Sequence, residues 1–184
     1  FNLSRFIDKI SSIFSGTAQL KGIKFIVDSQ NDTDIFIKGD EVRLSQVLIN
    51  LIGNALKFTE KGSVTLKVNV TDKVDANTYS VRFAVIDTGI GIKGDNIGKI
   101  FESFSQADSD TTRRFGGTGL GLSIADKIIS LMNSRLKVES EYHKGTTFFF
   151  EIDMVKSSSQ SSKNIIPLFQ NNNISLNINV LLAE

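Results

Sequence analysis

Apolar residues recur every three or four positions in three stretches of the chain, a period that indicates amphipathic helices. The stretches are Leu3 to Phe14, Val42 to Leu56 and Leu120 to Met132. Asp40 lies just before the second stretch, where an aspartate side chain can cap the first turn of a helix. Gly62 lies just past the end of that stretch, where a left-handed cap is expected. The pattern therefore predicts three helices.

Shorter runs of alternating or continuous apolar residues predict strands between and after the helices. They cover residues 23–27, 35–37, 63–70, 79–86, 136–141 and 146–154. The third and fourth runs flank the polar segment Thr71–Thr78 and are expected to form a hairpin, and Gly145 marks a turn between the last two. By contrast, Thr88 to Gly119 is long, polar and glycine-rich, without regular periodicity. A segment of this kind inside a compact domain is usually functional, often as a lid.

Composition narrows the class of protein. At 184 residues, the chain can form one domain of ordinary size with a buried core. Its net charge of +1 gives no reason to expect a nucleic-acid or membrane partner. The absence of cysteine excludes disulfides and thiolate metal sites and is compatible with a reducing compartment. The chain begins without Met and stops at Leu-Leu-Ala-Glu184, so we expect it to be a piece of a longer polypeptide.

Two glycine clusters are the strongest indication of function. They are Asp87-Thr-Gly-Ile-Gly-Ile92 and Gly116-Gly-Thr-Gly-Leu-Gly-Leu122, and the second leads directly into the helix predicted from Leu120. Glycine lets the backbone approach a ligand closely, and loop glycines that open a helix expose amide donors suited to phosphate oxygens. The second cluster is neither the P-loop pattern nor a dinucleotide fingerprint following a strand, so both of those folds are disfavoured. The clusters therefore predict a nucleotide site of another kind.

Asn50, Asn54 and Lys57 fall on one face of the second predicted helix, because they are spaced by four and three residues. Amide oxygens are hard ligands that suit Mg²⁺, and an ammonium group can hold a phosphate oxygen. The alternative is that this face is simply solvated.

Asp87 ends a predicted strand, where its carboxylate could accept a hydrogen bond from an exocyclic amine such as that of adenine. The alternative is an Asx turn that shapes the following loop. Phe101 and Phe104 pack in the core or anchor the lid. His143 is the only histidine and lies in a turn, so we expect it to be structural or solvent-exposed.

Taken together, these motifs resemble the ATP-binding catalytic domain of sensor histidine kinases, within the superfamily of gyrase, chaperone, kinase and mismatch-repair ATPases. The resemblance covers roughly Phe1 to Val155. Four boxes of that family have counterparts in the same order: an asparagine box at Asp40–Gly62, a first glycine box at Asp87–Ile92, a phenylalanine box at Ile100–Gln106 and a second glycine box at Gly116–Leu122.

The resemblance also implies roles for single residues. Asn54 would coordinate Mg²⁺ with Asn50 beside it, and Lys57 would contact the phosphates, which makes these three the catalytic residues. Asp87 would bind the adenine amine. The other nucleotide-binding residues that the resemblance implies are Gly89, Gly91, Ile92, Phe104, Arg114, Gly117, Thr118, Gly119, Leu120, Gly121, Leu122 and Thr147. Thr147 would support the base through its hydroxyl, and either Arg113 or Arg114 would reach the γ-phosphate.

The fold implied is an α/β, two-layer sandwich of the Bergerat type, in which three helices cover one face of a mixed, mostly antiparallel sheet. The function implied is transfer of the γ-phosphoryl group of Mg-ATP to a histidine on a dimerisation hairpin absent from the chain. A relay to an aspartate would follow. The hydrolytic relatives carry a water-activating glutamate at the position of Asn50, whose amide is a very poor base, so the site favours transfer over hydrolysis. The alternatives are a nucleotide-binding regulatory module without transfer activity and, less favoured because of Asn50, an ATP-hydrolysing clamp.

The segments around Phe104-Ser-Gln-Ala-Asp108 are especially similar to hybrid kinases, in which a receiver domain follows on the same chain. We therefore expect a catalytic domain at 1–155, a Ser/Asn-rich linker at 156–179 and the start of a receiver domain at 180–184. The domain would be cytoplasmic and monomeric by itself, within a homodimeric parent. Two turns depart from the family pattern: Met132-Asn133-Ser134 stands where paired glycines are frequent, and His143 where one glycine is common.

Overall fold

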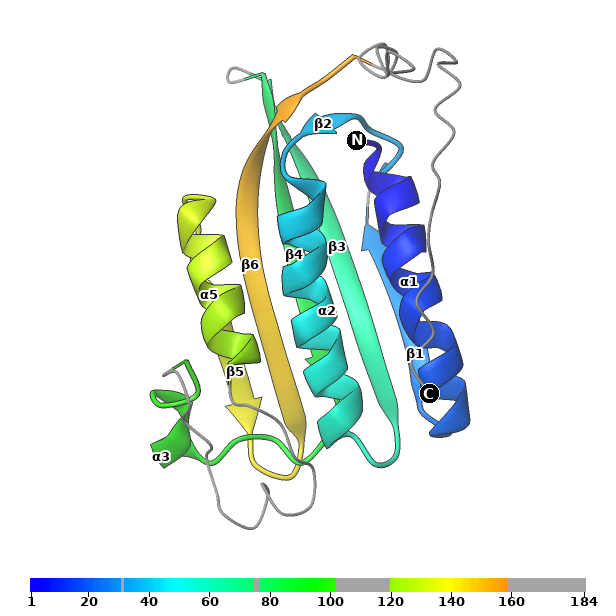
Figure 1. Ribbon diagram of the computed structural model, residues 1–184, viewed down its shortest axis with the longest axis vertical. Coiled ribbons are helices and arrows are strands. Elements are labelled where there is room, and N and C mark those ends of the chain that lie inside the picture. The colour runs from blue at the N-terminus through cyan, green and yellow to red at the C-terminus, as the bar shows by residue number, and fades with distance from the viewer. Residues whose placement is uncertain (31, 75–76, 102–119, 159–184) are drawn as a thin grey trace, which may run out of the picture.

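The computed structural model describes residues 1–30, 32–74, 77–101 and 120–158 (Figure 1). Its helices are α1 (Leu3–Leu20), α2 (Glu41–Phe58), α3 (Gly94–Ile97) and α5 (Gly121–Leu131). Its strands are β1 (Lys24–Gln30), β2 (Ile37–Lys38), β3 (Ser63–Lys73), β4 (Thr78–Asp87), β5 (Lys137–Glu141) and β6 (Gly145–Lys156). The one-turn helix α3 lies inside the segment for which the sequence predicted no regular structure. The predicted linker and receiver segment lie outside the described residues from position 159 onward.

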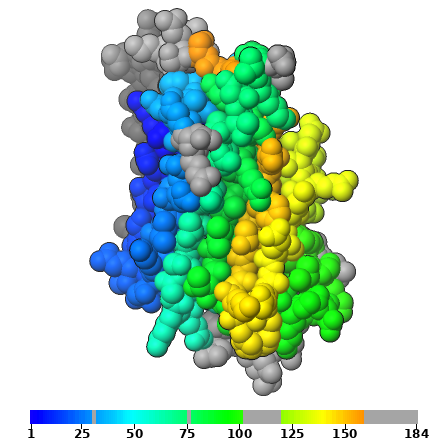
Figure 2. Space-filling model, turned by 180° about the vertical axis from the view of Figure 1, so that it is seen from behind, coloured from blue at the N-terminus to red at the C-terminus, as the bar shows by residue number. Residues whose placement is uncertain are grey.

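The sheet is mixed and mostly antiparallel, as predicted. Its strand order is β1-β3-β4-β6-β2, and β5 pairs with β6 beside this path. Strands β1 and β3 run parallel, whereas the pairs β3–β4, β4–β6, β5–β6 and β2–β6 are antiparallel. Helices α1, α2 and α5 lie on one face of the sheet (Figure 1). On the opposite face, the strands themselves form the surface (Figure 2). The predicted two-layer sandwich is confirmed.

The start of α2 follows the sequence, but its end does not. The Asp40 side chain accepts the N–H of Arg43 at 2.9 Å, which confirms the predicted cap. At the other end α2 stops at Phe58, with Thr59 extended, so Gly62 is not the helix cap. Gly62 has a φ of +113° and forms the turn into β3 instead. The prediction was wrong because tertiary contacts satisfy the helix end: Lys21 Nζ donates to the carbonyl of Leu56 at 2.8 Å.

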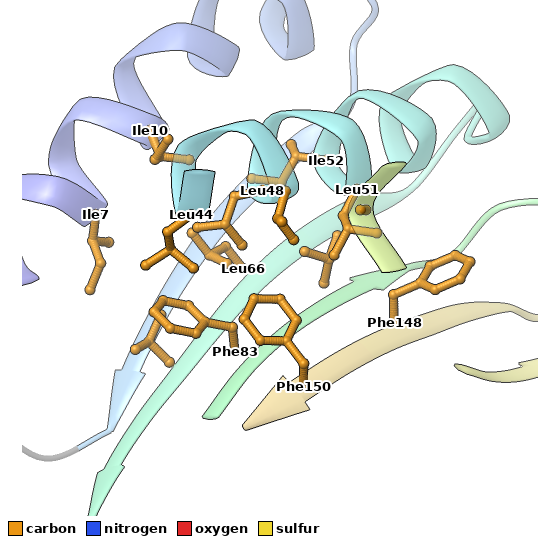
Figure 3. Close-up of a cluster of buried hydrophobic side chains, with 14 of the residues drawn as sticks. Ile7, Ile10, Leu44, Leu48, Leu51, Ile52, Leu66, Phe83, Phe148 and Phe150 are labelled. Carbon is orange, nitrogen blue, oxygen red and sulfur yellow. The ribbon is translucent and has the colours of Figure 1, made fainter. Parts of the chain in front are cut away.

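Alternate residues of the long strands point under the helices and form the core. The side chains of Leu66, Phe83 and Phe150 are buried from the sheet side, and the Phe83 and Phe150 rings stack with centroids 5.3 Å apart (Figure 3). Leu44, Leu48, Leu51 and Ile52 of α2 meet them from above (Figure 3). Each fully buried side chain of this size contributes about 1.5–3 kcal/mol. This packing fixes α2 against β3 and β4.

Candidate functional site

Most of the predicted site residues that the structure describes lie toward one end of the sandwich, where β4 ends, β6 begins and α2 stops. Asp87, the last residue of β4, is the register partner of Thr146 at the start of β6. On the same end, the first turn of α5 lies against α2, because Asn50 Nδ2 donates to the carbonyl of Gly121 at 3.2 Å. The asparagine helix, the first glycine loop and the end of the second glycine cluster therefore meet in space, although they are separated along the chain.

Asp87 forms the Asx turn that the sequence left open as one of two roles, and it keeps one carboxylate oxygen unused. Its Oδ1 accepts the N–H of Gly89 at 2.8 Å, which is the Asx turn, and also the N–H of Thr146 at 3.2 Å. Among the described residues, none donates to Oδ2. The residue is only 8% exposed, and this burial raises the pKa of the Asp87 carboxyl, while the hydrogen bonds from Gly89 and Thr146 partly oppose the rise. The turn therefore uses one oxygen and leaves the other as an acceptor.

The first glycine loop is held between the end of α2 and the β5–β6 turn. The N–H of Ile90 donates to the carbonyl of Phe58 at 3.3 Å, and the carbonyl of Ile90 accepts the N–H of His143 at 2.7 Å. A Cβ on Gly89 would lie 2.5 Å from the Phe58 oxygen, and one on Gly91, which has a φ of +66°, would overlap the carbonyl of Glu141. These two glycines are required because backbone passes directly over backbone.

The polar face of α2 forms the next wall of the site. Asn50, Asn54 and Lys57 are half-buried. The Nζ of Lys57 lies 4.8 Å from the centre of the Phe58 ring, and partial burial lowers the pKa of the Lys57 ammonium. Leu120, the residue before α5, supplies no side-chain cap, and Ile92 and Leu122 pack partly buried against the core. This face of α2 is therefore not simply solvated, because α5 contacts it at Asn50.

One predicted residue faces away from the site. Thr147 alternates with the buried Thr146 and Phe148, so its side chain belongs to the sheet face without helices. The hydroxyl on the same face as Asp87 is that of Thr146, which is 6% exposed. The sequence contained the signal: counting back in twos from the core positions Phe150 and Phe148 reaches Thr146.

The remaining predicted residues lie partly in described segments and partly outside the described residues. His143 has a φ of +67°, and its exposed ring lies on Tyr142 with centroids 3.8 Å apart, as expected of a structural turn residue. Phe101 is partly buried against the core. The predicted residues Phe104, Arg113, Arg114, Gly117, Thr118 and Gly119 lie outside the described residues. Within the described part of the chain, no cluster of three His, Cys, Asp or Glu side chains could hold a metal ion.

Residues 39–156 match the family of histidine kinase-, DNA gyrase B-, and HSP90-like ATPases. The chain belongs to this family. Within it, the chain is a histidine kinase catalytic domain, because the similar solved structures are such domains. The catalytic domain of histidine kinase ThkA is 30% identical with a TM-score of 0.69, over 84% of this chain and 94% of that one. Full-length ShkA in complex with AMPPNP is 32% identical with a TM-score of 0.71, over 86% of this chain and 31% of that one.

Similar curated members of the family are much longer proteins. The autoinducer 2 sensor kinase/phosphatase LuxQ of Vibrio cholerae is 36% identical over 152 residues, which are 83% of this chain and 18% of that protein. The hybrid signal transduction protein dokA of Dictyostelium discoideum is 40% identical over 172 residues, which are 91% of this chain and 10% of that protein. The chain thus spans less than a fifth of these relatives. None of its described helices is long and apolar enough to cross a membrane.

A cleft of about 310 Å³ on the other face of this kinase domain is separate from the candidate site. It is lined by Arg82, Ser134, Arg135, Lys137, Phe149, Phe150 and Glu151. The guanidinium of Arg82 lies 4.6 Å from the centre of the Phe149 ring, so this cation already has an aromatic partner. The cleft contains none of the predicted nucleotide residues.

Proposed function

We propose that the domain binds Mg-ATP at the end of the sandwich and donates the γ-phosphoryl group to a histidine of its parent chain. The observation that carries the proposal is the Asp87 carboxylate, buried with Oδ1 engaged by two backbone N–H groups and Oδ2 left to accept. The remaining oxygen can accept one more hydrogen bond, and the exocyclic amine of adenine supplies a suitable donor. AMPPNP in the similar ShkA structure supports a nucleotide as the ligand.

The glycine loop supports a flat ligand beside Asp87. Gly89 and Gly91 cannot carry a side chain without meeting backbone oxygens, so the loop has a smooth surface that a base can approach. In this proposal, the hydroxyl beside the base is that of Thr146 and not that of Thr147, because Thr146 lies on the same face of the sheet as Asp87. Ile92 and Leu122 contribute apolar surface near the loop and α5.

The phosphates would lie between α2 and the first turn of α5. Lys57 and the backbone N–H groups that begin α5 are suitable partners for phosphate oxygens. The amide donor set fits Mg²⁺ if Asn54 supplies one oxygen and the phosphates supply others, since Mg²⁺ is usually held by few protein groups. When bound, Mg²⁺ would neutralise charge on the transferred phosphoryl group.

Asn50 distinguishes transfer from hydrolysis. Its amide nitrogen donates to the Gly121 carbonyl, so the residue joins α2 to α5 and supplies no basic group to activate water. Alignment and charge neutralisation are the main requirements of phosphoryl transfer, and Asn54, Lys57 and the α5 amides can provide them. The acceptor would be a histidine on a helical hairpin of a homodimeric parent. Relay to a receiver aspartate would follow. The corresponding segments would be the linker at 156–179, whose first residue still pairs in β6, and the start of a receiver domain at 180–184.

The test measures binding and transfer separately. Isothermal titration with Mg-ATP and Mg-ADP is expected to show saturable binding to the chain, and labelled ATP is expected to leave the chain itself unlabelled. Supplying the histidine-bearing hairpin of the parent in trans is expected to give acid-labile phosphate on that hairpin. Acid-labile phosphate on His143 would contradict the assignment of the acceptor. Binding without any transfer to the hairpin would favour the nucleotide-binding regulatory module, and absence of binding would reject the site.

A further inference from the structure

Ser140 of β5 joins the three parts of the base-binding region by its hydroxyl. Its Oγ accepts the N–H of Ile92 at 2.8 Å, lies 3.0 Å from the carbonyl oxygen of Gly145 and lies 2.9 Å from Oγ1 of Thr146. Thr146 in turn donates its backbone N–H to Asp87 Oδ1. Ser140 therefore contacts the glycine loop, the turn before β6 and the residue paired with Asp87.

The hydrogens of this cluster can be assigned by counting donors. A serine hydroxyl has one hydrogen to donate and two lone pairs to accept with. The Gly145 carbonyl can only accept, so the Ser140 hydrogen goes to that carbonyl oxygen. One lone pair of Ser140 takes the Ile92 N–H, and the other remains for the hydroxyl of Thr146. All three contacts are hydrogen bonds only if Thr146 donates to Ser140.

This assignment determines what Thr146 offers to a ligand. With its hydrogen committed to Ser140, Thr146 Oγ1 has only lone pairs left. Asp87 Oδ2, on the register partner of Thr146, is likewise an acceptor. The two buried side chains therefore present acceptors alone, which match the two hydrogens of an amino group, directly or through a bridging water. A carbonyl oxygen at the same position would find no donor there.

We propose that Ser140 is a positioning residue that sets base specificity: it holds the Thr146 hydroxyl as an acceptor, so that the site selects a 6-amino purine over a 6-oxo purine. The proposal rests on the proposed function, because it concerns the base of the nucleotide bound there. Without Ser140, the Thr146 hydroxyl is free to rotate and to donate to a carbonyl oxygen. Discrimination between the two purines then weakens, while Asp87 keeps its own preference.

The experiment compares ADP with IDP, which carries a carbonyl oxygen in place of the 6-amino group, by titration calorimetry on the 184-residue chain. The measured quantity is the ratio of the dissociation constant for IDP to that for ADP. In the Ser140→Ala variant this ratio is expected to fall about tenfold, the effect of one hydrogen bond of ordinary strength. In the Ser140→Thr variant, which keeps the hydroxyl, the ratio is expected to stay close to that of the unmodified chain. Ser134→Ala is the matched control, because that hydroxyl also donates to a backbone carbonyl, of Glu151 at 2.5 Å, away from the loop.

A merely structural role gives a different result. If Ser140 only holds the loop, Ser140→Ala weakens ADP and IDP equally, the ratio stays constant, and the inference is overturned. Thr146→Val provides a second measurement that does not depend on Ser140→Ala folding: it is expected to lower the ratio, and adding Ser140→Ala to it is expected to change the ratio no further. An unchanged ratio in Thr146→Val also overturns the inference. Absence of ADP binding to the unmodified chain rejects the proposed function instead.

Discussion

The backbone N–H of Thr146, at the start of β6, donates to Oδ1 of Asp87, at the end of β4, across 3.2 Å. Because the Gly89 N–H binds the same oxygen, the carboxylate plane is set by backbone and not by mobile side chains. Backbone donors that are themselves fixed in a sheet and a tight turn lose little entropy when a ligand binds. The pair Asp87–Thr146 is therefore a preorganised acceptor site at the sheet end.

Asp87→Asn is expected to weaken Mg-ADP binding by about 1–3 kcal/mol, the cost of removing one partner of a buried charged hydrogen bond. The domain should stay folded, because an amide can still accept the Gly89 N–H. Titration calorimetry measures the affinity, and circular dichroism checks the fold. Asp8→Asn, on the exposed side of α1, is the control. If Asp87→Asn binds ADP as tightly as the unmodified chain, the adenine assignment is wrong.

Local signals in the sequence were sufficient for most of the fold. Asp40 capped α2 as predicted, because a cap depends on residues three positions apart. The end of α2 was predicted wrongly at Gly62, because Lys21, which follows α1, and Ile90 from the glycine loop bind carbonyls of its last turn. Contacts of this kind join residues that are distant in sequence. No local pattern contains them.

In the candidate site, too, local motifs could be predicted from the sequence and contacts between distant segments could not. The motif positions of Asn50 and Asp87 could be identified by sequence, and the structure brings their elements together. The choice between Thr146 and Thr147 depends on which side of β6 faces the helices, and the resemblance alone selected Thr147, whose side chain lies on the other side. Ser140 was missed because its importance comes from three contacts with other segments.

The raised pKa of Asp87 predicts how stability depends on pH. The folded state binds its proton more tightly than the unfolded state, so the free energy of unfolding falls as pH rises from the unfolded pKa, near 3.8, through the raised folded pKa. Above that window the ionised, buried carboxylate destabilises the ligand-free domain. Asp87→Asn is therefore expected to be more stable than the unmodified chain at neutral pH, with the advantage lost in acid. Urea denaturation between pH 3.5 and 8 measures this. A pH-independent difference would contradict it.

Gly89→Ala is expected to displace the glycine loop, since its Cβ would lie 2.5 Å from the Phe58 oxygen. Forced overlap with backbone costs about 1–3 kcal/mol of stability, and nucleotide affinity should fall with it because Asp87 and the loop move together. Gly94→Ala is the matched control, because nothing lies within 4 Å of its Cβ and its φ is not positive. Thermal melts and ADP titration compare the two. Equal behaviour of both variants would show that the loop does not need glycine at 89.

His143→Gly is expected to stabilise the domain. His143 holds a φ of +67° and Asn133 one of +57°, a region that costs an L-residue about 1–2 kcal/mol. Asparagine tolerates this region better than histidine, so His143→Gly should gain more than Asn133→Gly, up to about 1 kcal/mol after the greater chain entropy of glycine. His143→Ala, which removes the ring and keeps the conformation, should give no gain. Chemical denaturation ranks the variants, and a gain for alanine equal to that for glycine would rule out backbone strain as the cause.

Asn54→Ala is expected to abolish magnesium-dependent transfer to the histidine hairpin supplied in trans, because the metal neutralises charge developing on the transferred group. Asn50→Glu tests the neighbouring position: a carboxylate there offers a base to water, but it also faces the Gly121 carbonyl that now accepts the Asn50 amide at 3.2 Å. Repulsion between those oxygens should shift the side chain or the first turn of α5. We therefore expect slow ATP hydrolysis above the parental rate, together with weaker nucleotide binding. Release of inorganic phosphate measures hydrolysis, and labelled hairpin measures transfer. An Asn54→Ala variant that transfers phosphate at the parental rate in Mg²⁺ would overturn the metal assignment.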